Sequence, residues 1–373
     1  MTVLGVFFIA SMTYVSFRGI EIASWLQNVL VGIQYVALAV LVFAALLAVF
    51  GGDRPDTAID ISASWFNPME YFKEGGGGWG ALTEGMILMV FIYWGWDTIL
   101  SLNEETKDSA NTPGKAAVAA TLILLATYLL TTVASVSYAG VGTTGIGLGN
   151  EDNADDVFSV IGAEVLGGWD WIVILAVLVS AVASTQTTIL PAARGTLAMG
   201  IYRAIMSPFA KTHPRHLTPS VSTLFIGVAA TVIYVLLSLM GENVYGDVLL
   251  AIGLMIAFYY GITAYACVWY FRNDIKRGGK ALWTKGVLPL LGALMLTVAF
   301  FKSAFDMLSP DYGYLGGLTV PGTSWEIGSV FLFGIGTILA GLPIMWLVSR
   351  RAEQGPFFAG ETLHRDTPVE APD

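Results

Sequence analysis

The chain has 373 residues, of which 55% are hydrophobic and 12% are charged, and its formal net charge is −10. Soluble domains carry about 25% charged residues, so the composition excludes an ordinary soluble protein. The apolar residues stand in blocks of membrane-spanning length, which take about 20 residues each, and not in the short alternating strands of a lipid-facing barrel. The chain is therefore predicted to be an all-α polytopic membrane protein.

Nine apolar blocks predict about nine transmembrane helices. The first block reaches Arg18 after about 16 residues, which is short for a span. We expect the chain to begin inside a helix of a longer protein; the alternative is a short, tilted first helix. Between two of the blocks, residues 157–166 have helical spacing. The blocks cover residues 2–17, 27–50, 81–102, 116–140, 170–193, 219–240, 247–271, 287–307 and 327–349.

The basic residues are sorted by loop. If the blocks alternate in direction, only Arg54, Lys73 and Lys302 fall on the side opposite to the other lysines and arginines. Because cytoplasmic loops carry an excess of positive charge, the C-terminus is predicted to be cytoplasmic. We expect a multi-pass protein of the plasma membrane.

The third block contains the most informative segment, Phe-Ile-Tyr-Trp-Gly-Trp-Asp at residues 91–97. Gly95 gives the backbone the freedom to leave the helix. A broken membrane helix offers backbone N–H and C=O groups to the charged ends of a small zwitterion, and neighbouring aromatic rings supply apolar walls and cation–π faces. The segment therefore predicts a transporter with a helix broken near Gly95; the alternative is an aromatic interface belt with a packing glycine.

Asp97 is an acid well inside an apolar block. Charged groups at such positions are costly in lipid and commonly mark a pathway or a site. A carboxylate removed from water holds its proton more tightly, so Asp97 could exchange a proton during transport. The alternative is a structural or gating residue that caps a helix.

The fifth block carries hydroxyl side chains on one helix face, at Ser180, Ser184, Thr187 and Thr188, with Thr185 and Gln186 beside them. Oxygen atoms in this arrangement could bind a sodium ion or a substrate. The alternative is that the hydroxyls bond the carbonyl four residues earlier or pack helix against helix. Pro191 is expected to kink this block.

Several other classes of site find no support. The single cysteine, Cys267, excludes an internal disulfide and a cysteine metal site, and His213, His216 and His364 lie outside the blocks. We found no nucleotide-binding or nucleic-acid-binding motif. The chain is therefore predicted not to be an enzyme, to bind no metal or cofactor beyond a coupling H⁺ or Na⁺, and to have the lipid bilayer and a small molecule as its partners.

Three stretches resemble the amino acid–polyamine–organocation (APC) superfamily of permeases. They read SFRGIEIASWLQNVL from residue 16, FIYWGWDTILSLNEETKDSANTPGKA from residue 91 and ASTQTTILPAARGTLAMG from residue 183. The family has a leucine-transporter-like fold with two inverted five-helix repeats and two further helices. The resemblance implies that the nine blocks are helices four to twelve, so that the fold is N-terminally truncated and lacks its first three helices.

The resemblance also divides the chain. It implies that residues 1–50 are the remnant of the first repeat and that 81–271 form the second repeat, with five helices of which the first is broken near Gly95. Residues 287–349 are then the two additional helices, and 350–373 form a cytoplasmic tail that we expect to be disordered.

The resemblance implies roles for particular residues as well. Phe91 matches the aromatic gate of the sixth helix, Asp97 matches its acidic coupling or gating position, and Ser184 and Thr185 fall near the cation site of sodium-coupled relatives. Gln34 stands nearest to a lysine that replaces sodium in proton-coupled relatives, so that coupling mode is not implied here. The predicted substrate-binding residues are Phe91, Ile92, Tyr93, Trp94, Gly95 and Trp96.

Together these features favour ion-coupled secondary transport of amino acids or related organic amines by alternating access. The alternative is a truncated, non-transporting remnant or an assembly partner of a membrane complex.

Overall fold

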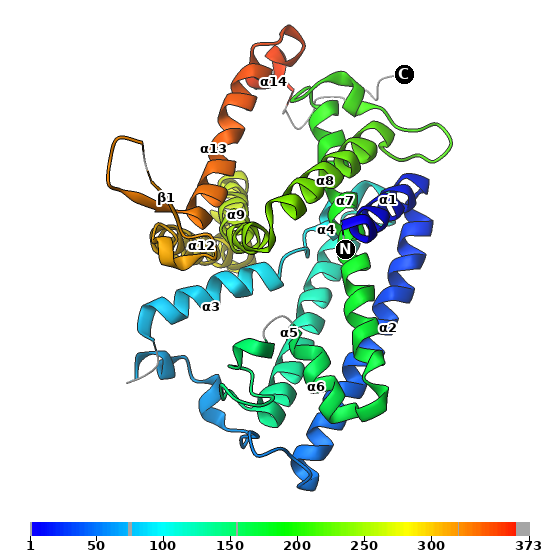
Figure 1. Cartoon of the computed structure of the whole chain (residues 1–373). Helices are drawn as coiled ribbons and strands as arrows, with labels where there is room; N and C mark the ends of the chain where they lie inside the picture. The colour runs from blue at the N-terminus through cyan, green and yellow to red at the C-terminus, as the bar shows by residue number, and fades with distance from the viewer. Residues whose placement is uncertain (1, 74–76, 154–155, 320, 363–373) are drawn as a thin grey trace. The chain divides into compact units, whose positions relative to one another are not determined.

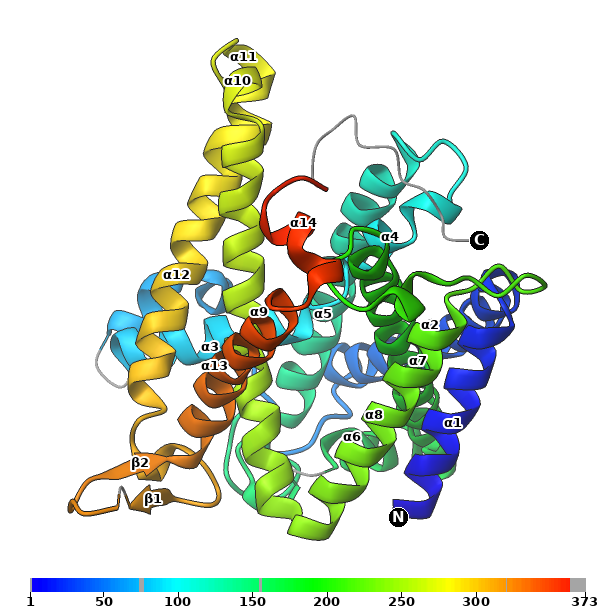
Figure 2. The ribbon, with the colours of Figure 1, turned by 90° about the horizontal axis from the view of Figure 1, so that it is seen from above.

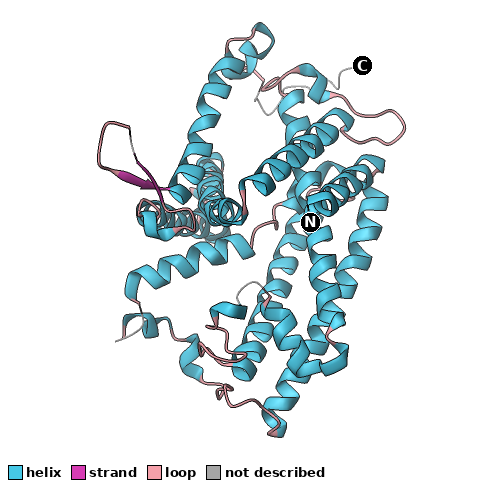
Figure 3. Cartoon of the chain, in the orientation of Figure 1, coloured by secondary structure: helices cyan, strands magenta, loops and turns pink. Residues whose placement is uncertain are grey.

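The computed structural model describes residues 2–73, 77–153, 156–319 and 321–362 of the chain, and nearly all of its regular structure is helical (Figure 3). Among the described residues, seven helices are long and apolar enough to cross a membrane. They are α2 (Ile20–Gly51), α5 (Thr112–Ala139), α7 (Trp171–Ile201), α8 (Ser220–Met240), α9 (Glu242–Tyr270), the continuous helix Gly279–Asp306 and α13 (Ser329–Ser349).

Two of the nine predicted blocks form shorter helices. The first is α1 (Thr2–Arg18), which ends before Gly19, whose φ of 129° lies outside the helical region. The second is α3 (Gly78–Ile92), which has 15 residues because its apolar block is interrupted by a turn. The helix predicted over residues 157–166 is confirmed as α6 (Val157–Leu166).

The chain divides into two compact units, and Figure 1 shows the course of the chain through its helices. The first unit contains α1, α2, α5, α6, α7, the short α4 (Thr98–Ser101) and the first half of α8. The second contains α3, α9, α12, α13 and the second half of α8. The first unit comprises Met1–Asn67, Gly95–Val232 and Ala359–Asp373. The second comprises Pro68–Trp94 and Ile233–Phe358.

In the first unit, α2 packs against α5 and α7, and α1 packs against both α2 and α7. Its largest core cluster includes Leu41 and Ala45 of α2, Ala134 of α5 and Ile161 of α6, all of them buried. Alanine at these positions lets the helix backbones approach closely, as is common between membrane helices. The side chain of Asp170 accepts a hydrogen bond from the backbone N–H of Trp171 at 2.9 Å and so caps the start of α7.

In the second unit, α9 is the central helix. It packs against α3, α12 (Leu288–Asp306) and α13, and Figure 2 shows α9 beside α12 with the short α10 (Arg272–Ile275) and α11 (Gly279–Ala281) at their joined end. Residues 282–287 between α11 and α12 form one turn of π-helix. At the other end of α12, β1 (Gly317–Thr319) pairs antiparallel with β2 (Glu326–Gly328).

The polar tail differs from our expectation in its first part. Residues 352–354 form a 3₁₀ turn and α14 (Gly355–Phe358) follows it. The side chain of Gln354 is buried and the rings of Phe357 and Phe358 lie edge to face, with centroids 5.2 Å apart. This first part of the tail therefore forms short helical turns. The predicted disorder of residues 363–373 lies outside the described residues.

Candidate functional site

The segment that the sequence singled out lies in a turn between two helices. The α-helix that begins at Gly78 ends at Ile92, residues 93–97 form turns, and α4 begins at Thr98. Gly95 has a φ of 108°, which side-chain-bearing residues rarely adopt. A Cβ atom at Gly95 would meet no atom within 4 Å. Glycine is therefore required by the backbone conformation and not by lack of space.

The boundary between the two compact units passes through this turn, between Trp94 and Gly95. The turn is closed by short-range backbone bonds on each side. The N–H of Tyr93 donates to the carbonyl of Met89 at 3.0 Å, and the N–H of Thr98 donates to the carbonyl of Gly95 at 3.1 Å. Terminal residues of helices are common hinge positions because they absorb changes of φ and ψ.

Asp97 is the residue that precedes α4. Its backbone carbonyl accepts hydrogen bonds from Leu100 N–H at 2.9 Å and Ser101 N–H at 3.2 Å, and its side chain is partly buried. Asp97 therefore stands at the end of the turn and directly before the first residue of α4.

Trp94 is tied to a distant part of the second unit. Its indole Nε1–H donates to the hydroxyl of Tyr259 on α9 at 2.7 Å. Trp94 remains 39% exposed, whereas Phe91, Tyr93 and Trp96 are partly buried. The hydrogen bond fixes the orientation of one of the predicted wall residues. This pair was not predicted from the sequence.

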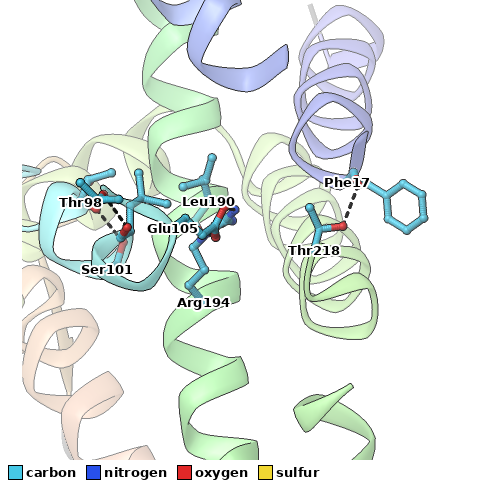
Figure 4. A network of polar contacts seen from close by, with 9 residues as sticks. Phe17, Thr98, Ser101, Glu105, Leu190, Arg194 and Thr218 are labelled. Carbon is cyan, nitrogen blue, oxygen red and sulfur yellow. Dashed lines mark hydrogen bonds and ion pairs between the residues drawn. The ribbon is translucent and has the colours of Figure 1, made fainter. Parts of the chain in front are cut away.

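In the first unit, α4 lies against α7 (Figure 4). Pro191 has no backbone N–H, so the carbonyl of Thr187, four residues earlier, lacks its helical donor. The hydroxyl of Thr98 donates to that carbonyl at 3.5 Å, and α7 continues as a helix through the proline. Because of the proline, the carbonyl of Thr187 can accept a hydrogen bond from Thr98, the first residue of α4.

Seven residues further along both segments, a charged pair joins them. Arg194 Nε donates to Glu105 Oε1 at 2.6 Å, and its Nη2 donates to Oε2 at 3.1 Å (Figure 4). The arginine side chain is only 5% exposed and the glutamate 29%. A two-pronged arginine–carboxylate pair fixes both orientation and distance. The short stretch from Thr98 to Glu105 is therefore held on α7 at both ends.

The predicted cation residues Ser184 and Thr185 lie on α7. The hydroxyl of Thr185 donates to the carbonyl of Ala181 at 2.9 Å, and that of Thr188 donates to the carbonyl of Ser184 at 2.9 Å. These bonds follow the pattern that the sequence analysis gave as the alternative to a cation site, although hydroxyl oxygens that donate a proton can still accept or coordinate.

A pair of amide side chains, one of them fully buried, lies beside these hydroxyls. Gln27 of α2 donates through Nε2 to Gln186 Oε1 at 2.8 Å and to the carbonyl of Ala183 at 2.9 Å. Gln186 is fully buried, and its Nε2 has no hydrogen-bond partner among the described residues. The shielded Nε2 of Gln34 on α2 also has no partner in the part of the chain that the structure describes. Gln27 and Gln186 therefore form a polar contact between α2 and α7.

The number and length of the apolar helices define a multi-pass membrane protein. The family model of the amino acid permeases matches residues 1–347, and the chain belongs to this family, as the resemblance to the APC superfamily implied. It is 29% identical over 223 residues to an uncharacterized transporter of Mycobacterium bovis and to uncharacterized transporters of two Mycobacterium tuberculosis strains. Each alignment covers 59% of this chain and 45% of the relative, which is less than half of the relative's length.

Proposed function

We propose that the chain transports amino acids or related organic amines across the plasma membrane by alternating access, with its C-terminus in the cytoplasm. The interruption at residues 93–97 carries this proposal, because it places a glycine of non-helical conformation inside the apolar segment of an amino acid permease. The transporter names of the relatives support the same class of activity.

Substrate binding is assigned to residues Phe91 to Trp96. An interrupted membrane helix takes backbone N–H and C=O groups out of the helical ladder, and half-helix ends add partial charges that suit a zwitterion. Trp94, held by Tyr259, and the ring of Phe91 would supply the apolar contacts. Phe91 is the proposed gate because it occupies the last turn before the break.

The same turn is the proposed hinge. Residues 93–97 connect the end of α3 to the start of α4, and residues at helix ends can absorb changes of φ and ψ. Such hinge motion is a common way for proteins to open and close around ligands. The Glu105–Arg194 ion pair is proposed to hold the segment that follows the hinge against α7.

Transport is proposed to be coupled to H⁺ or Na⁺. For H⁺, Asp97 is the candidate because it adjoins the turn and is partly buried. For Na⁺, Ser184 and Thr185 are the candidates, since hard cations take oxygen ligands.

The second candidate function is that of a non-transporting remnant or an assembly partner.

Uptake by the purified 373-residue chain in proteoliposomes distinguishes the two functions. Vesicles are loaded with buffer and given labelled L-amino acids and amines, with an inward H⁺ or Na⁺ gradient imposed in separate samples. Saturable uptake above that of empty vesicles supports transport by this chain. Correctly inserted protein that gives no uptake of any labelled compound contradicts the proposal and supports the remnant or assembly role.

A further inference from the structure

A pocket lies wholly within the second unit, between α3, α9 and the segment that follows α12. Its volume is about 360 Å³, which falls within the roughly 300–1,000 Å³ of ordinary small-molecule sites. Its lining includes Glu84, Phe91, Gly246, Gly253, Tyr312 and Tyr314.

The tyrosine-bearing side of the pocket is held in place by a buried carboxylate. Asp247 on α9 is fully buried, and it accepts hydrogen bonds from the backbone N–H groups of Tyr314 at 2.6 Å and Leu315 at 3.3 Å and from the hydroxyl of Ser329. A carboxylate that accepts several donors is well satisfied in a buried position. The segment 312–315 is therefore fixed on α9.

The wall formed by α9 is shaped by two glycines seven residues apart, which places them on the same helix face. A Cβ atom on Gly246 would lie 2.7 Å from the ring of Tyr314, and one on Gly253 would lie 2.8 Å from the side chain of Ile87. The absence of side chains at these positions lets both the tyrosine ring and α3 approach α9. The pocket thus has walls that are positioned by specific contacts.

The lining combines aliphatic side chains with three aromatic rings and one carboxylate, that of Glu84. Glu84 is exposed and has no hydrogen-bond or ion-pair partner among the described residues, whereas the nearby Asp306 is already paired with Lys302. Burial raises the pKa of the Tyr312 hydroxyl, and the carboxylates of Glu84 and Asp306 raise it further. The region therefore favours a cation. The rings of Phe91, Tyr312 and Tyr314 offer the faces to which organic cations bind.

We propose that this pocket is a second binding site, which takes a small organic ammonium compound with an apolar body and no carboxylate. Glu84 pairs with the ammonium group, and the rings of Tyr312 and Tyr314 flank the ligand. Phe91 is shared with the proposed substrate segment, whereas Glu84 and the two tyrosines belong to this pocket alone. A free carboxylate on the ligand would be repelled by Glu84.

The test is equilibrium binding of three related probes to the whole chain in nanodiscs: phenethylamine, phenylalanine and 3-phenylpropionate. The expected order of affinity is amine, then zwitterion, then anion. Glu84→Gln is expected to weaken phenethylamine binding about tenfold, because a hydrogen bond to a charged group is lost. Tyr314→Leu is expected to weaken it about threefold, as for an exposed cation–π contact. The matched control is Glu326→Gln, which removes the same charge from the neighbouring β-hairpin and should leave the affinity unchanged.

Comparison with Gly95→Leu separates this site from the proposed transport site. Phenethylamine binding that survives Gly95→Leu and falls with Glu84→Gln supports the pocket whether or not the chain transports amino acids. Binding that is lost with Gly95→Leu and kept with Glu84→Gln would place the amine in the substrate segment and overturn the inference. Equal binding of phenethylamine and 3-phenylpropionate would also overturn it.

Discussion

The Glu105–Arg194 pair allows a quantitative test of how the segment after the hinge is attached. Replacing Glu105 by Gln leaves the arginine, which is only 5% exposed, without its counter-charge. Loss of one partner of a buried ion pair costs about 3–5 kcal/mol. Since Glu105 is itself 29% exposed, water can reach the arginine from that side, and we expect a cost of about 2–3 kcal/mol.

The assay is unfolding of the purified chain in mixed micelles with increasing SDS, followed by tryptophan fluorescence. Asp60→Asn is the matched control, because the Arg54–Asp60 pair has the same 2.6 Å distance but Asp60 is 87% exposed. That change should cost less than about 1 kcal/mol, as surface pairs do. The double variant Glu105→Gln/Arg194→Met should recover at least about half of the loss, because no charge is then left buried.

If Glu105→Gln destabilises the protein no more than Asp60→Asn, the pair does not stabilise the fold as proposed. If the double variant loses as much stability as Glu105→Gln and Arg194→Met together, the two residues are not coupled.

Three further predictions concern the proposed transport machinery. Asp97→Asn should shift or flatten the pH dependence of uptake, and an unchanged profile would remove the proton role. The double variant Ser184→Ala/Thr185→Ala should weaken the dependence of uptake on sodium. If uptake by the parent chain does not depend on sodium, the proposed sodium site is wrong. Tyr259→Phe removes the hydroxyl that accepts the hydrogen bond of the Trp94 indole. It should lower the free energy of unfolding by about 1 kcal/mol and weaken substrate binding. Unfolding and binding curves identical to those of the parent chain would show that this hydrogen bond is unimportant.

The hydropathy of the sequence predicted the membrane class and the positions of most helices, because a bilayer imposes a minimum apolar length. It was less accurate at helix ends. The second block was predicted from residue 27, whereas α2 begins at Ile20, because a helix can carry polar residues such as Glu21 in its first turn outside the apolar run. The third block, which was counted as one span with a break near Gly95, contains α3, a turn and α4.

The turn over residues 93–97 coincides with the glycine from which the sequence led us to expect a broken helix. Glycine is informative there because a positive φ strains other residues. The contacts around the turn were not predictable in the same way. Glu105 and Arg194 are 89 residues apart, and Trp94 and Tyr259 are 165 apart, so each pair depends on how distant helices pack.

One signal for the ion pair was nevertheless present. Glu105 and Arg194 carry opposite charges, and each closely follows the C-terminal end of an apolar block, on the same predicted side of the membrane. Charges at such positions need partners in or near a membrane, which makes them natural candidates for pairing. The pocket beside Glu84 had no comparable signal, because it depends on the loop that Asp247 holds against α9.

The central claim is that the turn at Gly95 holds the substrate, and the most direct test is equilibrium binding of a labelled transported amino acid to the chain and two alanine variants. A Cβ atom meets open space at both Gly95 and Gly195, but only Gly95 has a positive φ. Gly95→Ala is expected to weaken binding about fivefold or more, because the left-handed conformation costs an L-residue about 1–2 kcal/mol, and Gly95→Leu should abolish binding without preventing membrane insertion. Gly195→Ala should bind as the parent chain does. Equal affinity of the parent chain and both Gly95 variants would contradict the account.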